Sequence, residues 1–189
     1  PISLTFAHYA PVAGVRGLWV GPYLADVFHL DALALGNASL AMGIAMILGS
    51  LAYGPLDRLL GTRKGVLLGG NLALAAALLG LWAWPAAGLS LAIALLCAVG
   101  FFGSSYPLMI AHGRSFFPHH LAGRGVTFLN LLAMGGAGLA QIASGRVYAA
   151  ATTGRPADAP AAHAAVFLFF GLLVLVACVP YTFARDRLD

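Results

Sequence analysis

The feature that most constrains this chain is a series of six long hydrophobic runs separated by short polar breaks. A helix needs about 20 predominantly apolar residues to cross the hydrocarbon core of a bilayer. The runs cover residues 2–28, 33–53, 65–84, 89–110, 125–149 and 164–183. They lack the alternation of apolar and polar residues that is typical of membrane β-strands. The sequence therefore predicts an all-α, polytopic membrane protein, a single domain over residues 1–189 with six transmembrane helices.

The composition agrees with a chain that is surrounded by lipid. Charged residues make up 8% of the sequence and hydrophobic residues 61%, whereas a soluble domain carries roughly 25% charged residues. The net charge of +4 does not indicate a nucleic-acid partner, because the basic residues lie at the ends of the apolar runs. Cys97 and Cys178 lie inside apolar runs without the spacing of metal ligands, so we expect no metal and no cofactor.

Lys and Arg residues are concentrated in alternate loops, which predicts the orientation of the chain. Seven lie in one set of loops and in the C-terminal tail, and only Arg155 lies in the opposite set. By the positive-inside rule the first set is cytoplasmic, so we expect an inner-membrane protein with a cytoplasmic C-terminus. The start at Pro1 lacks a basic segment and a cleavage site, which indicates an internal boundary and not a signal peptide. The seven residues are Arg58, Arg63, Lys64, Arg114, Arg124, Arg185 and Arg187.

Polar side chains inside the runs predict which helices face a water-filled pathway, because such side chains are costly in lipid. Tyr9, Arg16 and Tyr23 follow one another at heptad spacing, which keeps them on one helical face to within about 20° per heptad. The third and sixth runs carry few polar residues, so we expect these two helices at the periphery. The other predicted pathway residues are Ser104 and Tyr106 in the fourth run and Asn130 and Gln141 in the fifth.

Arg16 is the strongest single indication of a binding site. It lies near the middle of the first run, where an arginine costs roughly 2.5–3.5 kcal/mol on insertion scales. Two interpretations remain open: contact with an anionic solute or coupling ion, or an ion pair with an acidic residue from another part of the protein. No Asp or Glu lies deep inside any of the six runs.

The segment Gly54–Lys64, GPLDRLLGTRK, carries a second pattern. It resembles the signature turn between the second and third helices of each half in the major facilitator superfamily, roughly G-x-x-x-D-R-x-G-R-R. One extra residue separates Arg58 from Gly61, and the leading glycine is one place too close to Asp57. The stretch FPHHLAGRG and the spacing of Asn130, Gln141 and Gly145 are also similar to that family. The residues that match the signature are Asp57, Arg58, Gly61, Arg63 and Lys64.

The resemblance implies that residues 1–189 are a C-terminal six-helix half bundle, helices seven to twelve. It implies secondary transport of a small solute by alternating access, without catalysis, together with an N-terminal half or a second copy. The signature turn would then be a cytoplasmic gate. The alternative is that its basic residues only keep the turn in the cytoplasm.

The sequence leaves two other functions open beside transport. The chain could be a fragment that does not transport, and its polar helical face would then be exposed unless a second six-helix half packed against it. A membrane-embedded enzyme subunit would need paired His ligands for haem or a clustered catalytic set, and the six runs contain neither.

Overall fold

The computed structural model describes residues 2–153 and 160–186, and in this part of the chain all regular structure is helical. The predicted all-α fold class is confirmed. Arg155 and Arg187, which contributed to the predicted orientation, lie outside the described residues, as does Pro1. The elements are α1 (Ile2–Gly14), the π-helical turn η1 (Val15–Trp19), α2 (Val20–Phe28), α3 (Ala32–Leu60), α4 (Arg63–Ala83), α5 (Leu89–Phe102), α6 (Tyr106–Arg114), the 3₁₀ turn η2 (His119–Leu121), α7 (Ala122–Thr152) and α8 (Pro160–Tyr181).

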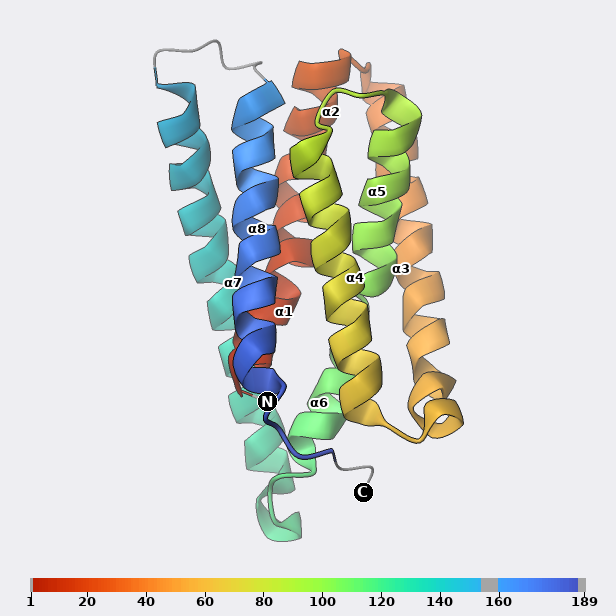
Figure 1. Ribbon diagram of the computed structural model, residues 1–189, viewed down its shortest axis with the longest axis vertical. Coiled ribbons are helices and arrows are strands. Elements are labelled where there is room, and N and C mark those ends of the chain that lie inside the picture. The colour runs from red at the N-terminus through yellow and green to blue at the C-terminus, as the bar shows by residue number, and fades with distance from the viewer. Residues whose placement is uncertain (1, 154–159, 187–189) are drawn as a thin grey trace.

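These elements form six rods, because α1, η1 and α2 continue one another, as do α5 and α6 (Figure 1). By length and composition, five of the rods in the described chain are able to cross a membrane: α3, α4, α5 with α6, η2 with α7, and α8. The rod that η1 interrupts is not among these five. The start of α1 and the end of α8 lie at the same end of the bundle, as expected for six rods that alternate in direction.

The helix boundaries differ from the sequence prediction most clearly at α3. The second run was predicted to end at Tyr53, but α3 continues to Leu60 and includes Pro55. The helix ends only where Gly61 takes a left-handed conformation (φ 64°), which glycine adopts without steric cost. The hydroxyl of Thr62 then accepts a hydrogen bond from the Gly65 N–H at 2.9 Å and caps α4. The predicted polar turn is therefore only two residues long.

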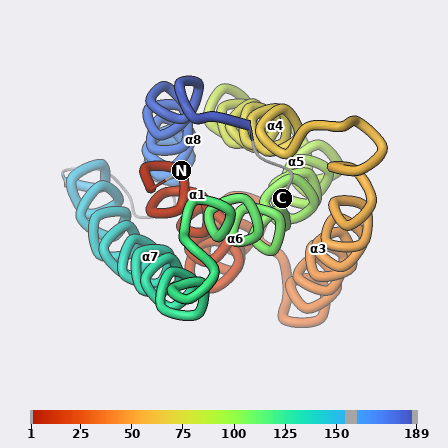
Figure 2. Tube along the Cα trace, turned by 90° about the horizontal axis from the view of Figure 1, so that it is seen from below, coloured from red at the N-terminus to blue at the C-terminus, as the bar shows by residue number. Residues whose placement is uncertain are grey.

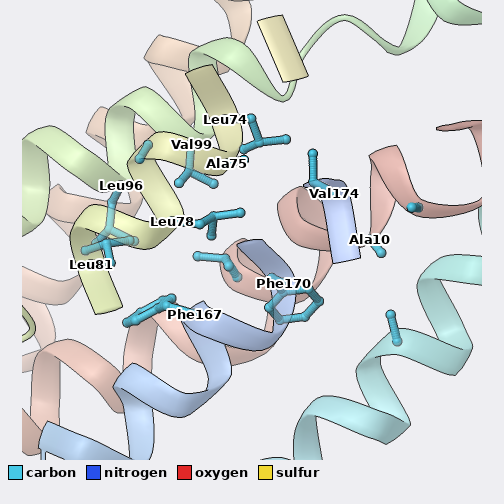
Figure 3. Packing of buried hydrophobic residues seen from close by; sticks show 14 of the residues in the cluster. Ala10, Leu74, Ala75, Leu78, Leu81, Leu96, Val99, Phe167, Phe170 and Val174 are labelled. Atoms are coloured by element: carbon cyan, nitrogen blue, oxygen red, sulfur yellow. The ribbon is translucent and has the colours of Figure 1, made fainter. Parts of the chain in front are cut away.

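The six rods are arranged with α4 and α8 along one side and with α3 and α7 at the two flanks (Figure 2). α1 and α6 lie between the flanks, and α5 packs between α3 and α4. The core is apolar and joins α4, α5 and α8 (Figure 3). Its labelled side chains include Leu74, Leu78, Leu81, Leu96, Val99, Phe167, Phe170 and Val174.

One polar cluster lies inside the apolar core and connects three rods. The ring of His8 in α1 is fully buried, with Nδ1 2.8 Å from Oδ1 of Asn71 in α4. Its Nε2 lies 3.2 Å from the hydroxyl of Ser105, in the break between α5 and α6. The amide of Asn71 donates to the Leu67 carbonyl at 2.8 Å. Both ring nitrogens therefore have partners, as buried polar atoms require.

Candidate substrate pathway

The π-helical turn determines where Arg16 points. The Val20 N–H donates to the carbonyl of Val15, five residues earlier, which widens the helix by one residue. Val15 and Trp19 are buried, whereas Arg16 is exposed. Pro11 removes a backbone donor one turn earlier. π-turns inside α-helices occur frequently at functional sites. The position of Arg16 in η1 is therefore a further indication that this residue is functional.

Arg16 faces an open groove between the first rod and α3. The groove has a volume of about 410 Å³, and its lining includes Tyr9, Arg16 and Ser39. A second hollow of about 650 Å³ continues along α3 past Gly43 and Ser50 and also includes Arg16 and Ser39. None of the lining residues comes from α4 or α8, the helices predicted to be peripheral.

The guanidinium of Arg16 has no ion-pair partner in the described ranges 2–153 and 160–186. The backbone of α3 lies close to this guanidinium, since a Cβ built at Gly43 would be 3.9 Å from Nη2 of Arg16, at van der Waals distance. The groove therefore presents one uncompensated positive charge to whatever enters it.

Aromatic and amide groups continue the polar surface beside Arg16. The ring of Tyr9 packs against the ring of Tyr106 in α6, with centroids 5.2 Å apart. The hydroxyl of Tyr106 donates to the side-chain carbonyl of Asn130 in α7. Three rods thus contribute to one surface, on which the structure brings together Arg16, Tyr9, Tyr106 and Asn130.

Arg16 and Tyr9 line the hollows, and Tyr106 and Asn130 continue from Tyr9 without lining them. The other three predicted pathway residues lie elsewhere. Tyr23 is fully buried, and its hydroxyl donates to the Pro85 carbonyl at 2.7 Å. The heptad prediction is wrong here because each residue added to a helix rotates the following face by about 100°, and η1 adds one. Ser104 is buried and donates to the Gly100 carbonyl at 2.7 Å. Gln141 in α7 is half-buried and lines neither hollow.

Two serines of α3 line the second hollow and were not predicted from the sequence. Ser39 and Ser50 are eleven residues apart, which is close to three helical turns and places both on one face. The same spacing singled out Asn130 and Gln141. The spacing of the two serines was therefore visible in the sequence. A serine hydroxyl is, however, a weaker indication of a polar pathway than the amide of an asparagine or glutamine.

The residues of the predicted gating motif connect the end of α3 to the start of α4 through hydrogen bonds. Asp57 is buried and accepts from Nε of Arg63 at 2.9 Å, so its cationic partner is Arg63 and not the neighbouring Arg58. The N–H of Gly61 donates to the Asp57 carbonyl. Arg58 is exposed. Arg63 is the first residue of α4, so the ion pair joins the last turn of α3 to the start of α4.

Lys64 extends this motif to the end of α8. Its ammonium donates to the Thr182 carbonyl at 2.6 Å, and its backbone N–H donates to Oδ1 of Asp186 at 3.0 Å. The hydroxyl of Thr62 donates to the other carboxylate oxygen of Asp186. Partial burial acts to raise the pKa of Asp186, but the hydrogen bonds from Thr62 and Lys64 outweigh it and hold the pKa below its usual value. The motif therefore ties α3, α4 and α8 together.

Comparison with known proteins identifies the family. The sequence model described as Major Facilitator Superfamily matches residues 3–188, nearly the whole chain. No curated protein and no solved structure gave a significant match. The all-helical bundle with its five long apolar rods agrees with this family of multi-pass membrane transporters. The chain belongs to the major facilitator superfamily.

Proposed function

We propose that this chain is the C-terminal half of a secondary transporter and moves a small anionic solute by alternating access. The observation that carries the proposal is the guanidinium of Arg16, which faces an open groove without an ion-pair partner in the described chain. An unpaired cation near the middle of a bundle attracts an anion, since charge interactions strengthen where water is scarce. Tyr9, Tyr106 and Ser39 supply neutral groups for orienting a ligand beside that charge.

The polar groove also supports a second bundle facing it. Arg16 would cost roughly 2.5–3.5 kcal/mol in contact with lipid at the bilayer centre. A second six-helix bundle, either another part of a longer polypeptide or a second copy of this chain, would cover the groove. The solute would then bind between the two bundles, and rocking of one against the other would expose it to each side in turn.

Uptake measurements in proteoliposomes test the role of Arg16. The full-length protein is assayed with inorganic phosphate and with a panel of small labelled carboxylates. We expect Arg16→Gln to reduce kcat/KM at least about 10-fold, because one charge-assisted hydrogen bond contributes about 1.5–3 kcal/mol. Arg16→Lys keeps the charge but loses the planar donor pair, so it should retain part of the activity.

Arg146→Gln is the matched control, since Arg146 is an exposed cation of α7 that lines neither hollow. It should transport like the parent protein. Unchanged affinity and rate in Arg16→Gln would rule out contact between Arg16 and the solute. If the parent protein transports neutral or cationic solutes and none of the anions, the anion assignment is wrong.

A further inference from the structure

The groove around Arg16 has two parts with different walls. The smaller hollow places the hydroxyl-bearing residues Tyr9 and Ser39 beside Arg16. Three residues, Arg16, Ser39 and Met46, line this hollow and also the larger one of about 650 Å³. Apart from Arg16, every residue that lines the larger hollow belongs to α3. The two hollows are therefore parts of one groove, and α3 forms the wall of the larger part.

The wall of α3 consists of two adjacent rows of side chains. Within each row, successive residues are four, three and four positions apart, which keeps them on one helical face. The first row carries both serines and a glycine. The second row lies one residue further along, which is about 100° around the helix, and contains only leucine and isoleucine. The first row is Ser39, Gly43, Met46 and Ser50, and the second is Leu40, Ile44, Ile47 and Leu51.

Arg16 lies against the first row and beside the second. A Cβ built at Gly43 would be 3.9 Å from Nη2 of Arg16, and Ser39 lines the smaller hollow together with Arg16. The leucines and isoleucines of the second row line only the larger hollow, and each keeps between 50% and 69% of its surface exposed. An anion bound to the guanidinium would therefore have hydroxyl groups near its charge and an apolar row beside the rest of the molecule.

The groove offers one charge and a long apolar wall. Among the described residues that line either hollow, Arg16 is the one that carries a charge at neutral pH. This cation balances one negative charge, whereas a second negative charge would lose water without a cationic partner on this bundle. A water molecule takes about 30 Å³ of liquid volume, so an ion as small as phosphate or acetate would fill only a small part of the groove.

We infer that the solute is an organic anion with a single negative charge and an apolar body, such as an aryl or branched alkyl carboxylate or sulfonate. This inference rests on the function proposed above, because it assigns a substrate class to the same groove. The oxyanion accepts hydrogen bonds from the planar guanidinium of Arg16. The apolar body lies along the second row of α3, where its removal from water adds affinity without any change of charge.

A homologous series of alkyl sulfonates separates the charge of the solute from its apolar body. Sulfonates stay ionised in ordinary buffers, and the series from methanesulfonate to pentanesulfonate differs only in its methylene groups. Dissociation constants for the full-length protein in detergent are measured by titration calorimetry, with Arg16→Gln in the same detergent as the blank. A methylene that is fully removed from water contributes roughly 4-fold in affinity. We therefore expect binding to tighten about 2- to 4-fold per methylene.

Ile47→Ser tests whether the second row of α3 supplies this affinity. We expect it to weaken the binding of pentanesulfonate at least about 5-fold and that of methanesulfonate much less, since the shortest probe does not extend along the row. Ile142→Ser in α7 is the matched control. Ile47 and Ile142 are both 62% exposed, and Ile142 lines neither hollow. Ile142→Ser should bind the whole series like the parent protein.

The outcomes distinguish the substrate class from the function on which it rests. If methanesulfonate binding depends on Arg16 but affinity stays constant along the series, the substrate class is wrong and the anion site stands. Equal effects of Ile47→Ser and Ile142→Ser overturn the inference, as does tighter binding of ethane-1,2-disulfonate than of ethanesulfonate. If no sulfonate binds in an Arg16-dependent way, the proposed function fails and this inference fails with it. If Ile47→Ser does not fold, the series in the parent protein decides alone.

Discussion

At the scale of single residues, the structure shows which arginine of the signature turn forms the ion pair with Asp57. Asp57 is buried against Arg63, and Arg58 is exposed. We expect Asp57→Ala to destabilise the bundle by about 1–3 kcal/mol, because a charge-assisted hydrogen bond is lost and Arg63 keeps an uncompensated charge. For a chain of this size, that corresponds to a decrease in Tm of about 2–12 °C, measured in detergent.

Arg58→Ala is the matched control, since it removes a charge from the same helical turn without removing a buried partner. Its free energy of unfolding should stay within about 0.5 kcal/mol of that of the parent protein. Equal losses in the two variants would mean that the turn stabilises the bundle only through its total charge. The sequence alone left the partner of Asp57 open, because Arg58 and Arg63 both lie within reach of it along the chain.

At the scale of helices, close backbone contact between α1 and α7 depends on one glycine. A Cβ added at Gly136 would lie 2.0 Å from the carbonyl oxygen of Phe6. Small residues at such crossings let membrane helices approach closely. Gly136→Ala must therefore push the two helices apart, and we expect a loss of about 1–3 kcal/mol, measured as a lower Tm in detergent.

Gly138 provides the control on the same helix, because a Cβ there meets no atom within 4 Å. Gly138→Ala should be neutral or slightly stabilising, since alanine is the better helix former. If both alanine variants lost the same stability, helix propensity or lipid contact would explain the effect and the close crossing would not. The sequence shows several similar glycines in this helix, and only the packing distinguishes Gly136 from the others.

The same scale explains the main error of the sequence prediction. The prediction that Tyr9, Arg16 and Tyr23 share one face assumes a regular helix through residues 2–28, and in the structure Tyr9 and Arg16 line the same hollow. It is wrong at Tyr23, because the π-turn intervenes. A periodicity argument assumes a constant helical repeat. No feature of the sequence indicates where a backbone hydrogen bond will span five residues instead of four.

At the scale of the whole molecule, composition predicted the fold class, because a chain with 8% charged residues cannot cover a surface in water. The signature residues predicted the family that the sequence comparison shows. The groove was predicted only in part. Whether Arg16 has a partner depends on residues far away in the sequence, and the order of polar residues along one helix contains no information about them.

Which end of the bundle lies in the cytoplasm remains a prediction, and cysteine labelling tests it. Cys97 and Cys178 are first replaced by alanine, so that the chain carries no other thiol. Ala87→Cys lies in the turn between α4 and α5, and His120→Cys lies in the turn before α7, at the opposite end of the bundle. Both positions are exposed, so both thiols are open to a maleimide wherever the reagent can reach.

If the basic turns are cytoplasmic, a membrane-impermeant maleimide added to intact cells labels Ala87→Cys and leaves His120→Cys unmodified until the membrane is opened. Labelling of both in opened cells is the control for reactivity. The reverse pattern in intact cells would place the signature turn outside. The Asp57–Arg63 pair would then face the exterior, and Asp26 and His163 at the opposite end would face the cytoplasm.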